Sequence, residues 1–238
     1  MINELSIIFP IYNEQKRLKK AFAEILKFKR FFNKKKLEIV FSDDGSSDKS
    51  QKLIEEFVKK NSNKLLLKKI LSSTNRGKGH ALKLGINLAT KKWILTSDLD
   101  LSVPLNQIIS WKKKNLIKEN NIIFGSRNVK NSIVKANILR MLLGKIFNFL
   151  VKNLLDISLK DTQCGFKLYR RSHAKKIFKE LNSRGFSHDL EIVLLSKKRK
   201  IKIIELPVKW EHKKGSKLNI FLEPVKMFLN ILILKIKY

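Results

Sequence analysis

Two aspartates, Asp98 and Asp100, follow directly after an apolar run at residues 93–96 and are separated by one leucine. The run predicts a buried strand, and at its end the chain turns, so that both carboxylates can converge on one ligand. Mg²⁺ and Mn²⁺ take oxygen ligands and are commonly held by one or two carboxylates together with substrate phosphates. The pair therefore indicates a catalytic metal site, with ordinary turn or helix-cap aspartates as the alternative explanation.

Polar clusters also follow the apolar runs at residues 5–9 and 37–42, and each of the three runs precedes a helical pattern. In open α/β sheets, ligands bind outside the carboxyl ends of the strands. The sequence therefore predicts that the three clusters meet at one binding site, although capping turns would also explain each cluster separately. The polar clusters of the two earlier runs contain Pro10, Tyr12, Glu14, Asp43 and Asp44.

The segment 75–79 (NRGKG) places two glycines and two basic residues at the start of a helical pattern. Glycine lets the backbone approach an anion closely, Arg76 and Lys78 supply positive charge, and a helix N-terminus adds a favourable dipole. The spacing is not that of a Walker loop. The segment predicts a loop near substrate phosphates, with an ordinary glycine turn as the alternative.

The chain is strongly basic, with 52 Lys and Arg residues against 20 Asp and Glu and a formal net charge of +32. Such a balance favours polyanionic partners: nucleic acid, anionic lipid or phosphorylated substrates. The lysines are scattered, and an AT-rich coding sequence would also produce abundant Lys, Ile and Asn, so part of the excess is compositional. Nucleic-acid binders cluster their basic residues on one face, and acidic strand ends would repel phosphate, so no nucleic-acid partner is predicted. A Lys-rich nucleic-acid-binding protein is the non-enzymatic alternative.

The cysteine content and the hydropathy pattern exclude further classes of protein. One cysteine, Cys164, excludes an intramolecular disulfide and a Cys-rich zinc site and suits a reducing compartment. No uncharged apolar run of about 20 residues is present, so a spanning helix is not expected. The chain begins close to its first predicted strand, so no secretory leader is expected.

Alternating strand and helix patterns predict an α/β domain with a mostly parallel sheet and right-handed crossovers. We expect residues 1–217 to form this domain and residues 218–238 to form an apolar, basic tail. The expected strands are 5–9, 37–42, 65–71, 93–97, 122–125 and 201–206, with a further short strand inside 161–171. The expected helices are 14–30, 47–60, 78–89, 104–118, 133–154 and 189–199.

Seven segments in order resemble family 2 glycosyltransferases, specifically the polyprenyl-phosphate sugar synthases. Any one of them is weak, but the ordered set covers nearly the whole chain, and residues 161–167 look more like the glucosyl than the mannosyl branch. The resemblance implies the nucleotide-diphospho-sugar transferase fold (glycosyltransferase A-type) with a mostly parallel central sheet. The segments are 9–14 (FPIYNE), 42–48 (SDDGSSD), 75–79 (NRGKG), 98–100 (DLD), 125–127 (GSR), 161–167 (DTQCGFK) and 206–210 (LPVKW).

The resemblance implies an inverting enzyme that moves a hexose, glucose by preference, from a nucleotide diphosphate sugar to a polyprenyl phosphate. UDP-glucose is the favoured donor, with GDP-mannose as the other possibility, and Asp98 and Asp100 would hold Mg²⁺ or Mn²⁺ against the diphosphate. A phosphate acceptor is already largely dianionic at neutral pH and needs little help from a base. A family 2 enzyme acting on a hydroxyl is the alternative, and it would need a base, for which Asp189 is the candidate.

The resemblance also implies roles for single residues. Asp189 would lie by the sugar, although it could simply cap the following helix. Arg140 would bind the acceptor phosphate, although an arginine that extends from a helix to the surface is the alternative. The donor site would comprise Pro10, Tyr12, Glu14, Asp43, Asp44 and Lys78, and the acceptor phosphate site Arg127, Arg140 and Lys217.

Two apolar segments with interspersed basic residues, 133–154 and 218–238, predict helices that lie on an anionic membrane surface. A prenyl acceptor resides in a bilayer, so peripheral attachment to the cytoplasmic face of the membrane is expected. The alternative is that both helices cover the sheet.

Overall fold

The computed structural model describes residues 2–135, 144, 148–149, 151–185, 187–213 and 222–238, without the side chains of 222–227. Its strands are β1 (Leu5–Ile11), β2 (Leu37–Asp43), β3 (Leu66–Leu71), β4 (Trp93–Thr96), β5 (Ile122–Ser126), β6 (Ile133–Lys135), β7 (Lys167–Arg170), β8 (Ile203–Pro207) and β9 (Lys209–Glu211). Its helices include α1 (Gln15–Phe28), α2 (Ser50–Asn61), α3 (Lys78–Leu88), α4 (Asn106–Lys113), α6 (Arg171–Glu180), α7 (His188–Lys198) and α8 (Leu222–Lys237).

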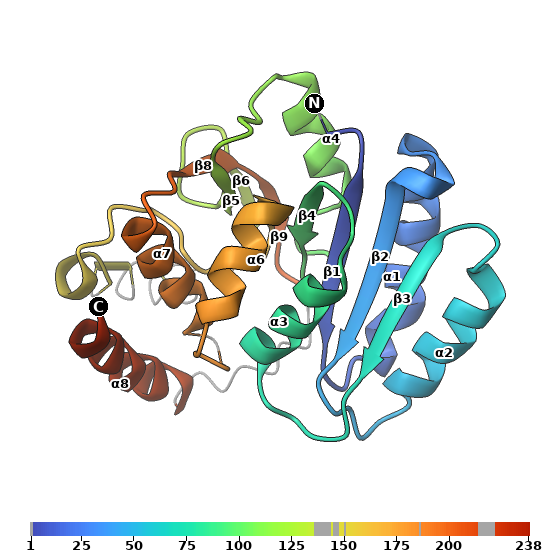
Figure 1. The fold of residues 1–238 in the computed structure, drawn as a ribbon, viewed down its shortest axis with the longest axis horizontal. Coiled ribbons are helices and arrows are strands. Elements are labelled where there is room, and N and C mark those ends of the chain that lie inside the picture. The colour runs from blue at the N-terminus through green and yellow to red at the C-terminus, as the bar shows by residue number, and fades with distance from the viewer. Residues whose placement is uncertain (1, 136–143, 145–147, 150, 186, 214–221) are drawn as a thin grey trace.

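Seven strands form a central sheet in the order β3-β2-β1-β4-β7-β5-β8, with helices on both faces (Figure 1). Strand β7 runs antiparallel to both of its neighbours, and the other pairs are parallel. Strands β6 and β9 form a separate parallel pair. The predicted α/β fold with a mostly parallel sheet is confirmed.

Helices α1, α2 and α4 cover one face of the sheet. Helix α1 forms because its apolar residues recur at helical spacing, at Leu18, Phe22 and Ile25, which places them on one buried stripe. Phe22 stacks on Phe57 of α2 with ring centroids 4.0 Å apart, and both rings meet Phe41 of β2 edge-on. This aromatic cluster fixes the two helices against the strands that carry the candidate donor residues.

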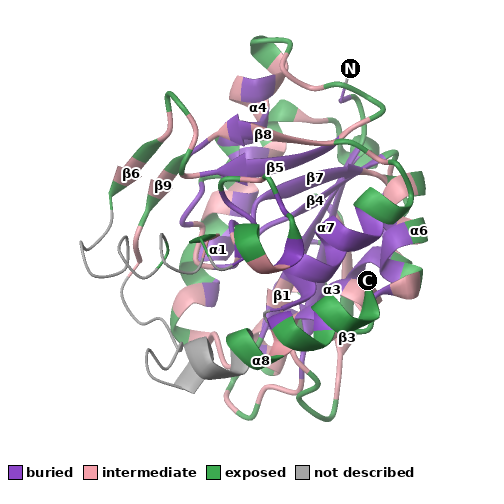
Figure 2. Cartoon of the chain, turned by 90° about the vertical axis from the view of Figure 1, so that its left-hand side faces the viewer, coloured by how far each residue is buried: buried purple, intermediate pink, exposed green. Residues whose placement is uncertain are grey.

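Helices α3, α6, α7 and α8 lie on the other face, where Figure 2 shows buried residues between them and the sheet. Ile231 and Leu234 of α8 belong to this second core, whereas Leu229, Ile233 and Ile236 are exposed. The tail helix is therefore amphipathic in its packing. No described helix has the length and apolar character needed to cross a membrane.

Element boundaries agree closely with the sequence expectations up to β4 and differ more beyond it. The helix expected over 133–154 is wrong at its start, because residues 133–135 form β6 and pair with β9; the described helical residues of that stretch include 151–155. Helix α4 ends at Lys113, well before residue 118, and the chain turns at Asn115 with φ 53°. Helix α6 and strand β9 were not predicted.

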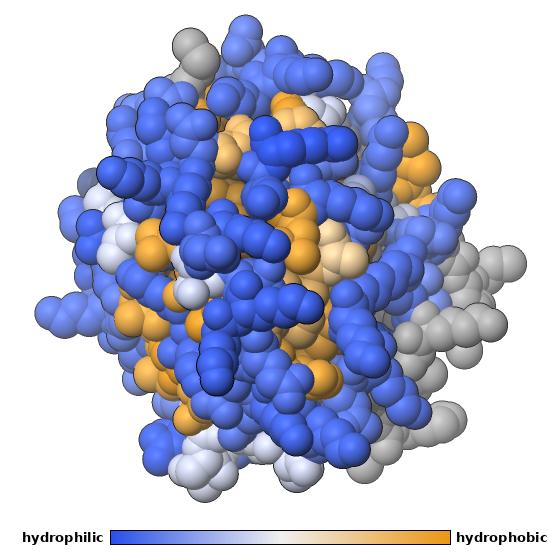
Figure 3. Space-filling view, turned by 90° about the vertical axis from the view of Figure 1, so that its right-hand side faces the viewer, coloured by the Kyte–Doolittle hydropathy of each residue, from blue (hydrophilic) through white to orange (hydrophobic). Residues whose placement is uncertain are grey.

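The surface is rich in hydrophilic side chains, as the charged composition of the chain predicts (Figure 3). The face over α2 and β3 in Figure 3 is mostly hydrophilic, with apolar patches between the polar side chains. Hydrophilic side chains therefore cover most of this face.

At the amino ends of the strands, a buried carboxylate ties β1, β2 and β3 together. Glu38 of β2 is fully buried and accepts hydrogen bonds from the Ser6 hydroxyl (2.5 Å) and from the Thr90 backbone and side chain (both 2.8 Å). Lys68 of β3 pairs with it at 2.7 Å. Burial alone would raise the pKa of Glu38, but Lys68 and the hydrogen bonds outweigh it and lower the pKa.

Glu38→Gln is expected to lower the free energy of unfolding by about 2 to 3 kcal/mol, because it removes a buried charge and leaves its donors poorly matched. Because folding lowers the pKa of Glu38, the stabilisation of the fold by its charge is complete above the unfolded-state pKa of 4.5. This stabilisation is lost as the pH falls further. Urea unfolding at pH 7 and pH 4 measures both effects. The matched control is Glu55→Gln, which removes an exposed partner of Lys69 and should change stability by less than about 0.5 kcal/mol. Equal effects of the two variants would contradict the role of Glu38.

Candidate active site

The carboxyl ends of β1, β2 and β4 lie side by side because these neighbouring strands run parallel. Tyr12 follows β1, Asp44 follows β2 and Asp98 comes shortly after β4. The glycine loop at the start of α3 reaches the same edge, where the Gly79 backbone N–H donates to the Arg184 carbonyl oxygen at 2.6 Å. The structure thus brings the predicted clusters to one edge of the sheet, where α/β folds bind ligands.

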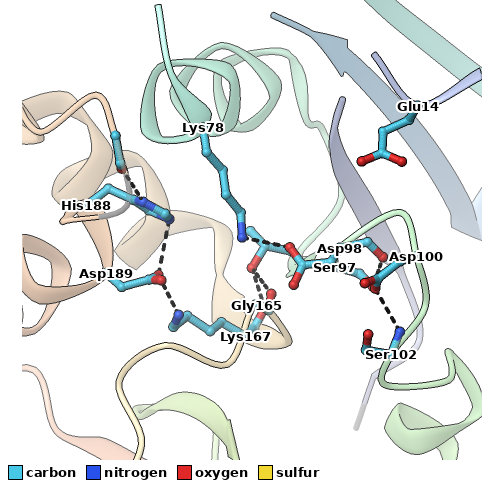
Figure 4. Close-up of polar contacts among 12 residues, drawn as sticks. Glu14, Lys78, Ser97, Asp98, Asp100, Ser102, Gly165, Lys167, His188 and Asp189 are labelled. Carbon is cyan, nitrogen blue, oxygen red and sulfur yellow. Dashed lines mark hydrogen bonds and ion pairs between the residues drawn. The ribbon is translucent and has the colours of Figure 1, made fainter. Parts of the chain in front are cut away.

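Lys78 and Asp98 form an ion pair at the centre of this edge, with Nζ 2.7 Å from Oδ1 (Figure 4). Burial alone would lower the pKa of Lys78, but the carboxylates of Asp98 and Asp189 outweigh it and raise the pKa. Burial would likewise raise the pKa of Asp98, and the charge of Lys78 instead holds it below its usual value. Both groups are therefore ionised at neutral pH, and Lys78 offers a fixed positive charge to a phosphate.

Asp100 lies in a tight turn that follows Asp98. The Leu101 N–H donates to the Asp98 carbonyl oxygen at 3.1 Å, and Leu101 has φ 52°, a left-handed conformation. That conformation costs a leucine about 1 to 2 kcal/mol, so the surrounding structure must enforce it. Asp100 Oδ1 accepts the Ser102 N–H at 2.9 Å, which orients the carboxylate next to Asp98 (Figure 4).

The two aspartates fit a divalent cation as a ligand pair. Among the described residues, no group of three or more His, Cys, Asp or Glu side chains is placed to hold a metal. Two carboxylates on one turn suit a hard cation whose other ligands are diphosphate oxygens and water. Asp98 Oδ1 contacts Lys78 and Asp100 Oδ1 accepts the Ser102 N–H, so one oxygen of each carboxylate is held in place by a described partner.

Asp43 and Asp44 shape the loops around the site. Asp44 accepts the backbone N–H groups of Arg76 (3.1 Å) and Gly77 (2.6 Å), and Gly77 has φ 100°, which glycine alone adopts without strain. Asp43 accepts the Ser46 N–H at 2.9 Å and also pairs with the side chain of Gln51 at 2.7 Å. The nucleoside contacts expected of these aspartates stay a prediction, and the structure adds that Asp44 holds the glycine loop.

Pro10, Tyr12 and Glu14 surround the end of β1 as expected. Pro10 lines a small cavity with Lys78 and Asp98. The Tyr12 ring is 41% exposed, and Glu14 pairs with Arg17 of α1 at 3.0 Å. The contact of Tyr12 with a nucleoside base stays a prediction.

Asp189 is buried at the start of α7 between the side chains of Lys167 and His188. Lys167 Nζ lies 2.5 Å and His188 Nε2 lies 3.1 Å from Asp189 Oδ1 (Figure 4). The other ring nitrogen of His188 lies 2.7 Å from the Gly185 carbonyl oxygen. Burial would raise the pKa of Asp189, but His188 and Lys167 outweigh it and hold the pKa well below the usual range. Asp189 is therefore an anion at neutral pH that holds the Lys167 and His188 side chains, and it is a weak proton acceptor.

Arg127, expected at the acceptor phosphate, is held by Asp161. Its Nε and NH2 atoms lie 2.7 and 2.8 Å from the two Asp161 oxygens, and its guanidinium lies 5.5 Å from the centre of the Trp210 ring. The pairing uses two of the five guanidinium N–H donors, so Arg127 is oriented and retains donors for another anion. Arg140 and Lys217, the other expected acceptor residues, lie outside the described residues.

Three functional positions were not recognised in the sequence. Lys167 and Gly165 stand inside the segment 161–167, but their proximity to Asp189 and Asp98 depends on β7 pairing with β4. A Cβ atom added to Gly165 would lie 2.3 Å from Asp98 Oδ2. His188, which contacts Asp189, is the third of these positions. The available signal was a lysine within an otherwise apolar strand pattern, which indicates a buried cation that needs a carboxylate partner.

Residues 6–178 match the family described as glycosyl transferase family 2. The chain belongs to this family. Family membership confirms the resemblance drawn from the ordered segments and makes the protein a glycosyltransferase, which decides against the non-enzymatic alternative. The strand-end aspartates and the glycine loop all lie within the matched range.

Curated relatives match almost the whole glycosyltransferase. The chain is similar to a dolichyl-phosphate beta-glucosyltransferase of Dictyostelium discoideum, at 37% identity over 98% of this chain and 74% of the relative. The human protein of the same name is 32% identical over 99% of this chain and 76% of its own length. The one from Saccharomyces cerevisiae is 31% identical over 98% and 75%.

Solved structures support the predicted fold. Glucosyl-3-phosphoglycerate synthase from Mycobacterium tuberculosis, in complex with Mn²⁺, UDP and glucosyl-3-phosphoglycerate, superposes with a TM-score of 0.67 at 13% identity, over 98% of this chain and 80% of that one. The mannosyltransferase PcManGT from Pyrobaculum calidifontis, in complex with GDP-Man and Mn²⁺, gives 0.60 at 17% identity, over 90% and 58%. At these identities the likeness shows the fold alone.

Gly165→Ala is expected to lower kcat/KM for glycosyl transfer on the order of a hundredfold, because the new methyl group displaces the Asp98 carboxylate from Lys78. Stability should change little, since the group that moves is a side chain at the cleft. Steady-state kinetics and thermal unfolding measure the two effects. Gly144→Ala is the control, because an added Cβ there meets no atom of the described residues within 4 Å. Full activity of Gly165→Ala would show that the position of Asp98 is not critical.

Proposed function

We propose that this glycosyltransferase transfers glucose from UDP-glucose to dolichyl phosphate or a related polyprenyl phosphate, with inversion at the anomeric carbon. The observation that carries the proposal is the similarity, at 31–37% identity over 98–99% of this chain, to three proteins named dolichyl-phosphate beta-glucosyltransferase. That similarity extends over every residue assigned above to the candidate site.

The chemistry required is a single displacement. A phosphate monoester has a second pKa near 6 and is largely dianionic at neutral pH, so one of its oxygens can attack the anomeric carbon directly. The bond from that carbon to the donor diphosphate breaks, and the electron pair leaves with UDP. No proton has to be removed from the acceptor. The lowered pKa of Asp189 supports this assignment, because a hydroxyl acceptor would need a stronger base.

The leaving diphosphate gains charge as the bond breaks, and Lys78 lies at the sheet edge where the donor would bind. Its ammonium group is kept charged and fixed by Asp98, so it needs no reorganisation during the reaction. Asp98 and Asp100 would hold Mg²⁺ or Mn²⁺, which, when bound, neutralises charge on the diphosphate. Lys167 pairs with Asp189 and would place a second positive charge near the position proposed for the sugar.

The acceptor phosphate is proposed to bind next to Arg127, with Arg140 and Lys217 as further candidates. Asp161 holds the Arg127 guanidinium in a bidentate pair, and the Trp210 ring lies against it. A guanidinium fixed in this way can present its remaining donors to phosphate in one orientation. The arrangement lowers the entropy cost of binding the acceptor head group.

We further propose that the protein attaches peripherally to the cytoplasmic face of an anionic membrane through α8. Three apolar side chains of this helix, Leu229, Ile233 and Ile236, are exposed, and lysines follow at 235 and 237. Amphipathic helices with such faces lie in the membrane interface. A prenyl chain that stays in the bilayer would then reach the site without a spanning helix.

The test is transfer of radiolabelled sugar by the purified protein to dolichyl phosphate in lipid vesicles with Mn²⁺. UDP-glucose should yield an organic-extractable product in clear preference to GDP-mannose. Incorporation from GDP-mannose alone would show that the protein transfers mannose and not glucose. Incorporation from neither donor would overturn the proposal.

Asp98→Asn and Asp100→Asn are each expected to cut turnover by about a hundredfold or more, close to 3 kcal/mol of barrier. Asp98 fixes Lys78, and both carboxylates would hold the metal, so both losses fall on departure of the diphosphate. The control is Asp156→Asn, an exposed aspartate paired with Lys197. Full activity of both site variants in the presence of a chelator would refute the metal role.

Replacing Ile233 and Ile236 together by glutamate should weaken binding to anionic vesicles by about tenfold or more, because two apolar side chains leave the interface and two negative charges enter it. Vesicle co-sedimentation measures the change. Ser62→Glu with Asn63→Glu, exposed residues just after α2, makes the same charge change elsewhere and should have a smaller effect. If both double variants bind equally well, α8 is not the membrane contact.

A further inference from the structure

Glu191 is a fully buried carboxylate two residues after Asp189 that joins two distant parts of the chain. Its Oε2 atom accepts the backbone N–H groups of Asn182 (3.1 Å) and Ser183 (2.6 Å). Its Oε1 atom accepts Lys237 Nζ at 2.7 Å and the Tyr238 hydroxyl at 2.9 Å. One side of the carboxylate therefore holds a loop before α7, and the other side holds the end of α8.

The loop that Glu191 holds packs directly against the glycine loop of the active site. The Gly79 N–H donates to the Arg184 carbonyl oxygen at 2.6 Å. A Cβ atom on Gly79 would lie 2.4 Å from the Ser183 carbonyl oxygen, and one on Gly77 would lie 2.4 Å from that of Arg184. The two backbones are thus in contact with no space for a side chain, so a shift of residues 182–185 must move the loop that carries Lys78.

The end of α8 is needed for this arrangement because a buried carboxylate is costly without donors. Burial would raise the pKa of Glu191, and Lys237, Ser183 and Tyr238 instead lower it. If the Lys237 and Tyr238 side chains moved away, Glu191 Oε1 would lose both of its described partners. The Glu191 carboxylate would then favour a conformation in which water reaches it. Ile231 and Leu234 anchor the same helix in the core, and Figures 1 and 2 show the end of the chain beside α7.

We propose that Glu191 is a positioning residue that couples docking of the end of α8 to the geometry of the glycine loop carrying Lys78. This proposal depends on the proposed function only in taking UDP-glucose as the donor whose KM is measured. Because α8 also carries the exposed apolar face proposed to meet the membrane, the helix that would contact lipid also completes the donor site.

The test uses the full chain with Lys237→Met and Tyr238→Phe combined, since both residues are at the surface and the fold should survive. Hydrogen exchange of the Gly79 and Ser183 amides should accelerate on the order of tenfold or more. The donor KM should rise several-fold and kcat should fall, because the displaced loop carries Lys78, which would face the leaving diphosphate. Lys235→Met removes the same charge from the same helix without touching Glu191 and should change none of these quantities. The single variant Lys237→Arg keeps the positive charge and Tyr238, so its Gly79 and Ser183 amides should exchange as slowly as those of the wild type.

Unchanged exchange at both amides would overturn the coupling, as would faster exchange with an unaltered donor KM or an equal effect of Lys235→Met. The exchange measurement needs no substrate, so it decides the coupling even if wild-type protein fails to transfer glucose, in which case the proposed function fails separately.

Discussion

Charge compensation at the carboxyl edge of the sheet is the constraint on which the site depends. Asp98 and Asp189 lie in the same enclosed region, and two such carboxylates would normally repel each other and take up protons. Lys78 and Lys167 each pair with one of them, and His188 supplies a further contact to Asp189. The result is a fixed lattice of alternating charges in which Asp98, Asp189 and Lys78 keep their ionised forms at neutral pH.

This lattice determines what chemistry the site can support. Carboxylates with lowered pKa values are poor bases, so they serve as anchors and cation ligands. Lysines fixed by those anchors are preorganised for phosphate groups, and such preorganisation in an enclosed site is worth more than the same charges in water. A reaction between two phosphorylated substrates, in which the acceptor needs no deprotonation, suits this distribution better than transfer to a hydroxyl.

Sequence patterns predicted the first half of the fold and the meeting of the strand-end aspartates at one edge of the sheet, because both depend on local signals. Apolar runs that end in Asp43 and Asp98 must bring those aspartates to one edge once the strands are parallel. Other features arise only from distant contacts. The partner of Glu191 lies 46 residues away at Lys237, Lys167 reaches Asp189 through an antiparallel strand, and residues 133–135 become a strand by pairing with β9. The left-handed Leu101 has no sequence signal, since leucine rarely adopts that conformation.

The most direct measurement of the central claim compares two acceptors that differ only in the phosphate. Dolichyl phosphate and dolichol are presented in the same vesicles with UDP-glucose, and the initial rates of glucose transfer are compared. A site built from weak bases and fixed lysines should use dolichyl phosphate and leave the alcohol essentially unglucosylated. Transfer to dolichol at a comparable rate, abolished by Asp189→Asn, would show that Asp189 acts as a base and would contradict the role given to the charge lattice.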